Sequence, residues 1–207
     1  MQHHLTGAIL TGGMARRLQP LGKNIDKGLV DLHGKPLVAW VADTLAPLSQ
    51  QQPLLISANR YLQCYAHYGQ VVQDPTIFSG YQGPLAGLYA LLSACTTDWL
   101  MVLPVDTPFV PFSVVQRFWQ TRSRYPLQRA FFARHERDHP LCLLLHRSCA
   151  PHLATYLQQG QRRVFGWLQQ QEAVAVDMHQ FDATVFLNLN TPEDLENARQ
   201  QAFSSRL

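Results

Sequence analysis

Residues 98–105 read DWLMVLPV, and Asp106, Thr107 and Pro108 follow directly. A continuous apolar run of this kind predicts a strand that is covered on both faces, as in a parallel sheet between two layers of helices. A carboxylate at the end of such a strand is costly to bury without a compensating partner. Asp106 is therefore a candidate Mg²⁺ ligand, and an Asp that caps the next helix explains the pattern equally well.

Apolar runs alternate with helical patterns on both sides of this strand. We expect further strands near 6–10, 53–57, 71–72, 130–134, 141–146, 174–176 and 185–187. We expect helices over 37–48, 84–94, 111–122, 150–158 and 164–171, and a last one from Thr191 onward. This alternation predicts a three-layer α/β fold, a mostly parallel, Rossmann-like sheet with helices on both faces, whose ligands bind beyond the carboxyl ends of the strands.

Length and composition narrow the class of protein. The 207 residues predict a single domain over 1–207. A net charge of +3 without a dense basic run argues against general nucleic-acid binding. No apolar stretch reaches 18 residues and no signal peptide opens the chain, which predicts a cytoplasmic protein without a membrane segment. The four cysteines lack CxxC spacing and are expected to be reduced thiols.

The lysines are confined to one short stretch. Lys23, Lys27 and Lys35 are the only three in the chain, and the other 14 of the 17 basic residues are arginines. Because this stretch follows the first strand, it predicts a need for ammonium groups at the end of that strand. Lys35 precedes the first helix and is expected to be structural, whereas Lys23 is either a phosphate contact or a solvated side chain.

The first strand runs into a candidate phosphate-binding loop. Thr11, Gly12 and Gly13 come first, then an arginine pair ending at Arg17, and later Lys27. Paired glycines allow backbone amides to approach a phosphate closely, and the cationic side chains add donors. Neither GxGxxG nor GxxxxGK[ST] is present, which excludes a Rossmann fingerprint and a P-loop. A tight turn before a solvated basic loop is the alternative, and we favour the phosphate interpretation.

Other polar or small residues stand at strand ends and helix starts. Asp74 follows the short strand at 71–72, and Gly83 and Gly87 open the helix over 84–94, where an anion could bind or a plain junction could form. Further along, ERDHP includes His139, and G-x-RR includes Arg162 and Arg163; a hydrogen-bonded loop pair and solvated arginines are the alternatives. Asn188 and Asn190 share one face of a strand end, which suits a flat heterocycle or simple turn chemistry.

Taken in order, these motifs resemble the molybdenum cofactor guanylyltransferase family within the nucleotidyltransferase fold. The matching segments are LTGG-x-ARR, DKG, GKPL, GPLAG, DTP, ERDHP, G-x-RR and N-x-NTPEDL, between residue 7 and about residue 196. The resemblance implies transfer of GMP from GTP to the terminal phosphate of molybdopterin, release of pyrophosphate and a requirement for Mg²⁺. It implies that residues 1 to about 110 bind GTP and Mg²⁺ and that the remainder faces the pterin.

The resemblance also assigns roles to positions of this chain. On the nucleotide side it implies contacts from Leu10, Thr11, Gly12, Gly13, Ser57, Asp74, Gly83 and Gly87. As catalytic residues it implies Arg17 and Lys27, which neutralise the triphosphate, and Asp106, which holds Mg²⁺. On the pterin side it implies Asn188, Asn190, Arg162, Arg163 and His139. We expect a monomer that works with cofactor-delivery or acceptor proteins.

Two features depart from the family pattern. The link over 18–25, between the arginine pair and the DKG motif, is longer than usual in the family. Ser57 stands where the family often has Asn, and a hydroxyl forms fewer hydrogen bonds than an amide. Asn59, two residues on, could supply the missing amide.

Two other functions remain open from the sequence. A cytidylyltransferase on the same fold differs in a few base contacts that the motifs do not define. A non-catalytic nucleotide-binding adaptor is the alternative from another class, and the presence of Lys27 and Asp106 favours an enzyme.

Overall fold

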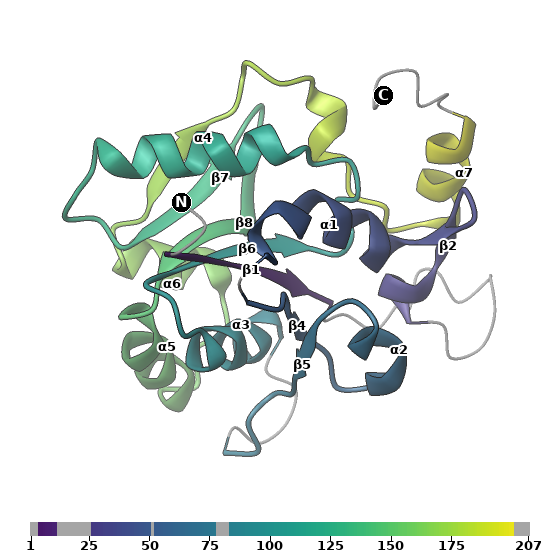
Figure 1. The fold of residues 1–207 in the computed structure, drawn as a ribbon. Helices are drawn as coiled ribbons and strands as arrows, with labels where there is room; N and C mark the ends of the chain where they lie inside the picture. Colours follow the sequence, from purple (N-terminus) through teal and green to yellow (C-terminus); the bar gives the residue numbers. More distant parts are fainter. Residues whose placement is uncertain (1–3, 12–25, 51, 78–82, 201–207) are drawn as a thin grey trace.

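The computed structural model describes residues 4–11, 26–50, 52–77 and 83–200. Its centre is a seven-stranded sheet in the order β5-β4-β1-β6-β8-β7-β9 (Figure 1). The strands are β1 (Leu5–Leu10), β4 (Leu55–Ser57), β5 (Gln70–Val72), β6 (Trp99–Pro104), β7 (Ala130–Arg134), β8 (Asp138–His146) and β9 (Val174–Asp177). All neighbouring pairs are parallel except the two that involve β8. The prediction of a mostly parallel sheet is confirmed.

Helices cover both faces of the sheet. One layer holds α1 (Leu37–Leu45), α4 (Phe112–Ser123) and α7 (Pro192–Gln200), and the other holds α3 (Pro84–Ala94), α5 (Cys149–Gln158) and α6 (Val164–Gln170) (Figure 1). Met101 and Leu103 of β6 pack in the core under α1 and α4, whereas Leu100 and Val102 pack under α3 and α5. Apolar side chains on both faces of one strand explain its uninterrupted apolar sequence. Within the described ranges, no helix has the length and apolarity needed to cross a bilayer.

One predicted strand is wrong. In the segment expected as a strand at 185–187, Val185 and Phe186 belong to a 3₁₀ helix, η4 (Ala183–Phe186), and Leu187 is its C-cap. The Asp182 carboxylate accepts a hydrogen bond from the Thr184 amide at 2.8 Å, and the Val185 amide donates to the Asp182 carbonyl at 3.1 Å. These local bonds satisfy the backbone in a turn and leave the short apolar run without a sheet partner.

Four other short elements were not predicted. A 3₁₀ turn, η2 (Lys27–Leu29), precedes a two-stranded ribbon of β2 (Asp31–Leu32) and β3 (Lys35–Pro36), and α2 (Leu62–Ala66) follows β4. Lys35 pairs with Asp43 of α1 and lies over the Trp40 ring, 5.1 Å from its centroid. This contact agrees with the structural role expected for Lys35.

The reversed strand β8 is longer than predicted and alters one edge of the sheet. It begins at Asp138, whereas the apolar pattern suggested a start at Leu141. Because β8 is antiparallel to β6 and β7, its amino end lies at the edge where the other strands have their carboxyl ends. Asp138 and His139 are thereby brought to the edge at which a parallel sheet binds ligands.

Candidate active site

The candidate site lies where β1, β4 and β6 end. Leu10, the last residue of β1, is in register with Ser57 of β4 and Pro104 of β6. The pairing continues beyond the strands, because the Thr11 amide donates to the Ser57 carbonyl at 3.3 Å and Val105 donates to Leu10 at 3.0 Å. The residues that follow these strands therefore emerge side by side.

Lys27, Asp106 and Asn190 meet at this edge. The Lys27 Nζ lies 2.8 Å from Asp106 Oδ2 and also donates a hydrogen bond to Asn190 Oδ1. The Lys27 side chain is 12% exposed and that of Asp106 is 23% exposed. The attraction between the two charges is stronger in this partly buried position than at the surface, and it keeps a cation and a carboxylate in contact at the strand ends.

The turn that carries Lys27 is held in place by Tyr65. The Tyr65 hydroxyl, from α2, donates to Asp26 Oδ1, and Asp26 in turn caps the Gly28 amide at 3.4 Å. Burial, reinforced by the nearby Asp26, raises the pKa of Tyr65, so its hydroxyl remains a donor. Gly28 has no room for a side chain, since a Cβ there would lie 2.4 Å from the Tyr65 hydroxyl oxygen.

Asn190 is fixed by the start of α7. The amides of Asn190 and Thr191 both donate to Asp194 Oδ2 at 2.8 Å, and the Asp194 amide donates to Thr191 Oγ1 at 3.1 Å. This reciprocal arrangement is a capping box. The Leu189 amide also donates to the Asp106 carbonyl at 2.9 Å, which docks the segment onto the end of β6.

A cavity of about 260 Å³ opens beside Asp106. Its lining includes Asp106, Arg137, His139, Cys142 and Asn188. The His139 ring stacks on Phe186, 4.7 Å between centroids, and burial together with the Arg137 charge lowers the pKa of His139. A neutral imidazole and an amide thus stand beside the carboxylate, where they can hydrogen-bond a polar second substrate.

The other nucleotide-side residues lie between β4, β5 and α3. Ser57 is buried, and a Cβ on Gly87 would lie 2.3 Å from its Oγ, so this glycine permits close packing of α3 on β4. Gly83 precedes α3 with φ of +64°, a conformation that favours glycine. The Asp74 amide donates to Asn59 Oδ1 at 2.9 Å, and burial raises the pKa of the Asp74 carboxyl.

Not every predicted residue is brought to this cluster. Arg162 donates from Nη1 to the carbonyls of Leu157 and Gln161. Arg163 stands at the N-cap position of α6, with no capping hydrogen bond from its side chain. Neither residue lines the cavity beside Asp106. The remaining predicted residues, Gly12, Gly13 and Arg17, lie outside the described residues, as does Lys23.

Two residues that shape the site were not predicted from the sequence. Asp194 was visible only as one of two acids in the first turn of a helix, although the Thr-x-x-Asp spacing is compatible with a capping box. Tyr65 gave no signal, because it is 39 residues from Asp26 in the chain and belongs to a helix that was not predicted.

The parallel sheet, the Lys27–Asp106 pair at its carboxyl edge and the adjoining cavity define a nucleotidyltransferase-type enzyme. The family described as MobA-like NTP transferase domain matches residues 7–174. A molybdenum cofactor guanylyltransferase of Yersinia pseudotuberculosis is 40% identical over 196 residues, 95% of each chain, and one of Yersinia pestis strain Pestoides F is 39% identical over the same share. The chain belongs to the molybdenum cofactor guanylyltransferase family.

Solved structures show the same architecture. Molybdopterin-guanine dinucleotide biosynthesis protein A from Archaeoglobus fulgidus superposes with a TM-score of 0.74 at 25% identity, covering 94% of this chain and 96% of that one. A 2-C-methyl-D-erythritol 4-phosphate cytidylyltransferase from Thermus thermophilus reaches a TM-score of 0.65 at 16% identity, over 95% and 97% of the two chains, and shares the fold.

Proposed function

We propose that this chain transfers GMP from GTP to the terminal phosphate of molybdopterin in the molybdenum cofactor and releases pyrophosphate. The observation that carries the proposal is the 40% identity to a guanylyltransferase over 95% of the chain. The Lys27–Asp106–Asn190 cluster at the strand ends supports it, because that edge is where nucleotides bind in parallel sheets.

The residues at this edge fit a Mg²⁺ ion. Only one oxygen of Asp106 takes the Lys27 hydrogen bond, which leaves Oδ1 as a ligand. The described residues contain no group of three or more His, Cys, Asp or Glu able to hold a metal. The proposed ion would be bound by the Asp106 carboxylate, water and substrate phosphates. When bound, Mg²⁺ withdraws charge from a phosphoryl oxygen.

The chain's own residues align and neutralise two anions. In the proposed reaction, an oxygen of the pterin phosphate forms a bond to the α-phosphorus of GTP, and the bond from that phosphorus to the bridging oxygen of pyrophosphate breaks. Lys27 donates to the triphosphate and offsets the charge that grows on the leaving group. Asn188 and His139 line the acceptor side and orient the pterin phosphate.

Pyrophosphate release measured with each of the four nucleoside triphosphates, with molybdopterin as acceptor, tests this proposal. Of the four nucleoside triphosphates, we expect turnover only with GTP, in the presence of Mg²⁺ and molybdopterin. Activity with CTP alone would favour a cytidylyltransferase, and GTP binding without turnover would favour an adaptor. Lys27→Met is expected to lower kcat/KM at least about 100-fold, as loss of a charge-stabilising donor does in other enzymes. Lys35→Met is the matched control, since Lys35 pairs with Asp43 of α1.

The oligomeric state, the cellular location and the partner proteins are also part of this proposal. A monomer, a cytoplasmic location, and partner proteins that deliver or accept the cofactor stay predictions. Gel filtration with light scattering tests the first of them, and it is expected to give a mass near the 23.5 kDa of one chain.

A further inference from the structure

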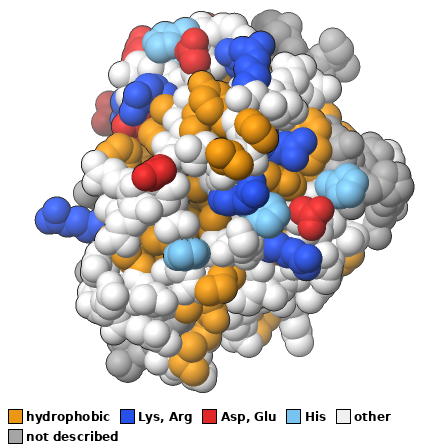
Figure 2. Space-filling model, turned by 90° about the vertical axis from the view of Figure 1, so that its left-hand side faces the viewer, with side chains coloured by type: hydrophobic (Ala, Val, Ile, Leu, Met, Phe, Trp, Pro, Cys, Tyr) orange, Lys and Arg blue, Asp and Glu red, His pale blue; other side chains and the backbone are white. Residues whose placement is uncertain are grey.

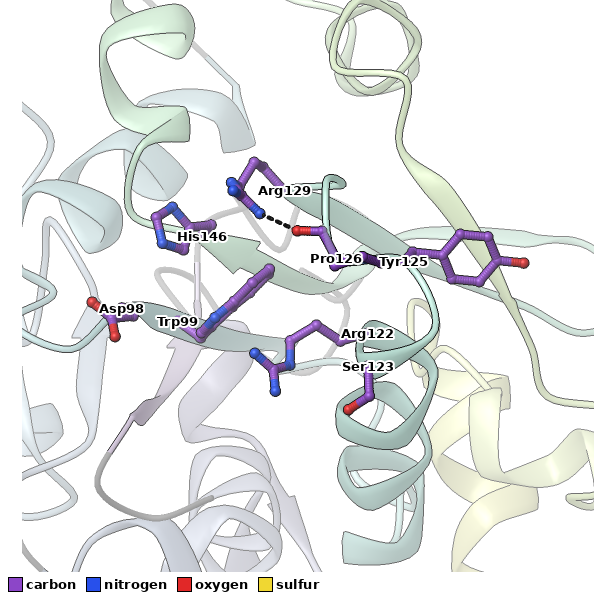
Figure 3. Close-up of a pocket in the computed structure, with 8 residues that line it drawn as sticks. All are labelled: Asp98, Trp99, Arg122, Ser123, Tyr125, Pro126, Arg129 and His146. Carbon is purple, nitrogen blue, oxygen red and sulfur yellow. Dashed lines mark hydrogen bonds between the residues drawn. The ribbon is translucent and has the colours of Figure 1, made fainter.

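A second cavity lies at the opposite end of β6 from Asp106. It has a volume of about 370 Å³ and is bordered by the start of β6, the end of α4, the α4–β7 connection and the end of β8 (Figure 3). Since β6 spans six residues, about 17 Å of strand separate this cavity from the candidate active site. Figure 2 shows this end of the molecule, with basic side chains set among apolar ones.

Positive charge prevails around this cavity. Arg122 and Arg129 line it, and Arg147 lies next to it. Among the residues that the structure describes, Asp98 is the one acid in the lining, and its two oxygens already face Arg147 at 3.8 Å and His4 at 3.3 Å. Among the described lining residues, two arginines therefore have no carboxylate of their own.

Arg122 is held rigidly between aromatic rings. Its guanidinium carbon lies 3.9 Å from the ring centroid of Trp119 and 5.2 Å from that of Trp99. Its Nε is buried and has no hydrogen-bond partner within the part of the chain that the structure describes. Burial lowers the pKa of Arg122, because a charge without water or an anion beside it is destabilised.

Arg129 and His146 lie on the other side of Trp99 (Figure 3). Arg129 donates from Nη1 to the Pro126 carbonyl at 2.8 Å and to that of Gln128 at 3.4 Å, which fixes the guanidinium and leaves its other nitrogens for a ligand. His146 Nδ1 accepts a hydrogen bond from the Ser148 amide at 3.2 Å and lies 2.7 Å from Ser148 Oγ. In the tautomer in which Nδ1 accepts both hydrogen bonds, Nε2 carries the proton and is the donor. Burial and the Arg129 charge keep His146 neutral by lowering its pKa.

We infer that this cavity binds an oxyanion, either a carboxylate or a phosphate group, through Arg129 and His146 with Arg122 supplying further positive charge. Guanidinium groups bind both oxyanions in a bidentate manner. Backbone carbonyls hold Arg129 in place before the ligand arrives, and aromatic rings hold Arg122 and His146. The site is separate from the proposed transferase reaction and would not contact its substrates.

Nuclear magnetic resonance of the full chain can test this inference. The indole N–H signal of Trp99, assigned with Trp99→Phe, is followed while inorganic phosphate or acetate is added at constant ionic strength. We expect saturable shifts; a stronger response to phosphate identifies a phosphate-bearing ligand, and a stronger response to acetate identifies a carboxylate. The shifts should persist in Lys27→Met, which weakens anion binding at the active site. No saturable shift with either probe overturns the inference.

Three variants keep the test specific. Arg129→Gln is expected to weaken binding at least about tenfold, the usual effect of losing a charge-assisted hydrogen bond. Arg124→Gln is the matched control, an exposed arginine at the end of α4 that does not line the cavity, and it should change affinity less than about twofold. Equal losses in both variants would reduce the effect to general surface charge and overturn the inference. His146→Phe keeps a ring beside Trp99, removes the Nε2 donor, and should weaken binding even if Arg129→Gln is unstable.

Discussion

Lys27 receives its two acceptors from distant parts of the chain, Asp106 and Asn190. The resemblance implies a pterin-side role for Asn190, but its hydrogen bond leads us to expect that it acts through Lys27, the residue proposed to bind the triphosphate. Asn188 instead lines the cavity beside Asp106. We expect Asn190→Ala to raise the KM for GTP about tenfold, because a hydrogen bond to a charged group contributes about 1.5 kcal/mol or more. Asn188→Ala should instead raise the KM for molybdopterin. Steady-state kinetics with each substrate varied in turn separates the two, and identical profiles for both variants would contradict this division.

Tyr65 packs so close to Gly28 that no side chain fits at this position. Gly28→Ala should destabilise the protein by about 1–3 kcal/mol, as overpacking does, because the new methyl group would meet the Tyr65 hydroxyl. Removing that hydroxyl in Gly28→Ala/Tyr65→Phe should recover part of the loss, measured by urea unfolding. If the double variant is as unstable as the sum of the two single variants, the clash is not the cause.

At the scale of elements, the start of α7 links protonation to stability. Hydrogen bonds from the amides of Asn190 and Thr191 outweigh the opposing effect of burial and lower the pKa of Asp194. With a depressed native pKa, the stabilisation is present above the ordinary value of about 3.9 and is lost as the pH falls through the native value.

Asp194→Asn should consequently lower the melting temperature at pH 7, where the cap contributes about 1 kcal/mol. Its difference from the parent protein should shrink as the pH drops below about 4, since the parent loses the same charge. Glu193→Gln, in the same helical turn but exposed, is the control and should show a small difference. Thermal unfolding from pH 7 to pH 3 measures this, and a constant difference for Asp194→Asn would contradict it.

Most of the regular elements were predictable from the sequence, because the apolar pattern and the local start and stop residues indicate the same element there. The apolar run of β6 and the proline that opens α3 are local signals, and the structure confirms both elements. The segment at 185–187 failed because three apolar residues cannot distinguish a strand from a turn whose hydrogen bonds come from Asp182. The reversal of β8 left no local signal, since strand direction is decided by packing over the whole sheet.

The candidate site was predictable in its strand-end residues and not in what positions them. Lys27 and Asp106 are identifiable from the sequence as charged residues that follow the first strand and the most apolar strand. The parallel topology brings them together. Tyr65 could not be predicted, because its hydrogen bond to Asp26 exists only once α2 has packed under the turn. The contact between Asn190 and Lys27 spans 163 residues and required the whole fold.

At the scale of the whole molecule, two cores flank the sheet and enclose most of the thiols. Cys95, Cys142 and Cys149 are buried and Cys64 is exposed. Burial raises the pKa of Cys142 to about 12 and that of Cys149 to about 11, and the thiolate is the reactive form. Ellman's reagent at pH 8 should therefore react rapidly with one thiol in the native protein and with all four in denaturant.

Cys64→Ser should abolish the rapid phase of that reaction and leave the slow phase unchanged. Rapid reaction of two or more thiols in the native parent protein would contradict the burial of the other three.

The antiparallel β7–β8 hairpin has an evolutionary consequence. Its connecting residues lie at the ligand-binding edge, next to the cavity that holds His139, and they are not part of the β1–β4–β6 strand ends near Lys27. Insertions or deletions in this hairpin would reshape the proposed acceptor side while the strand ends proposed to bind the nucleotide keep their register. A fold of this kind can acquire new acceptor molecules by changing one loop, which is consistent with enzymes of different acceptor chemistry sharing the architecture.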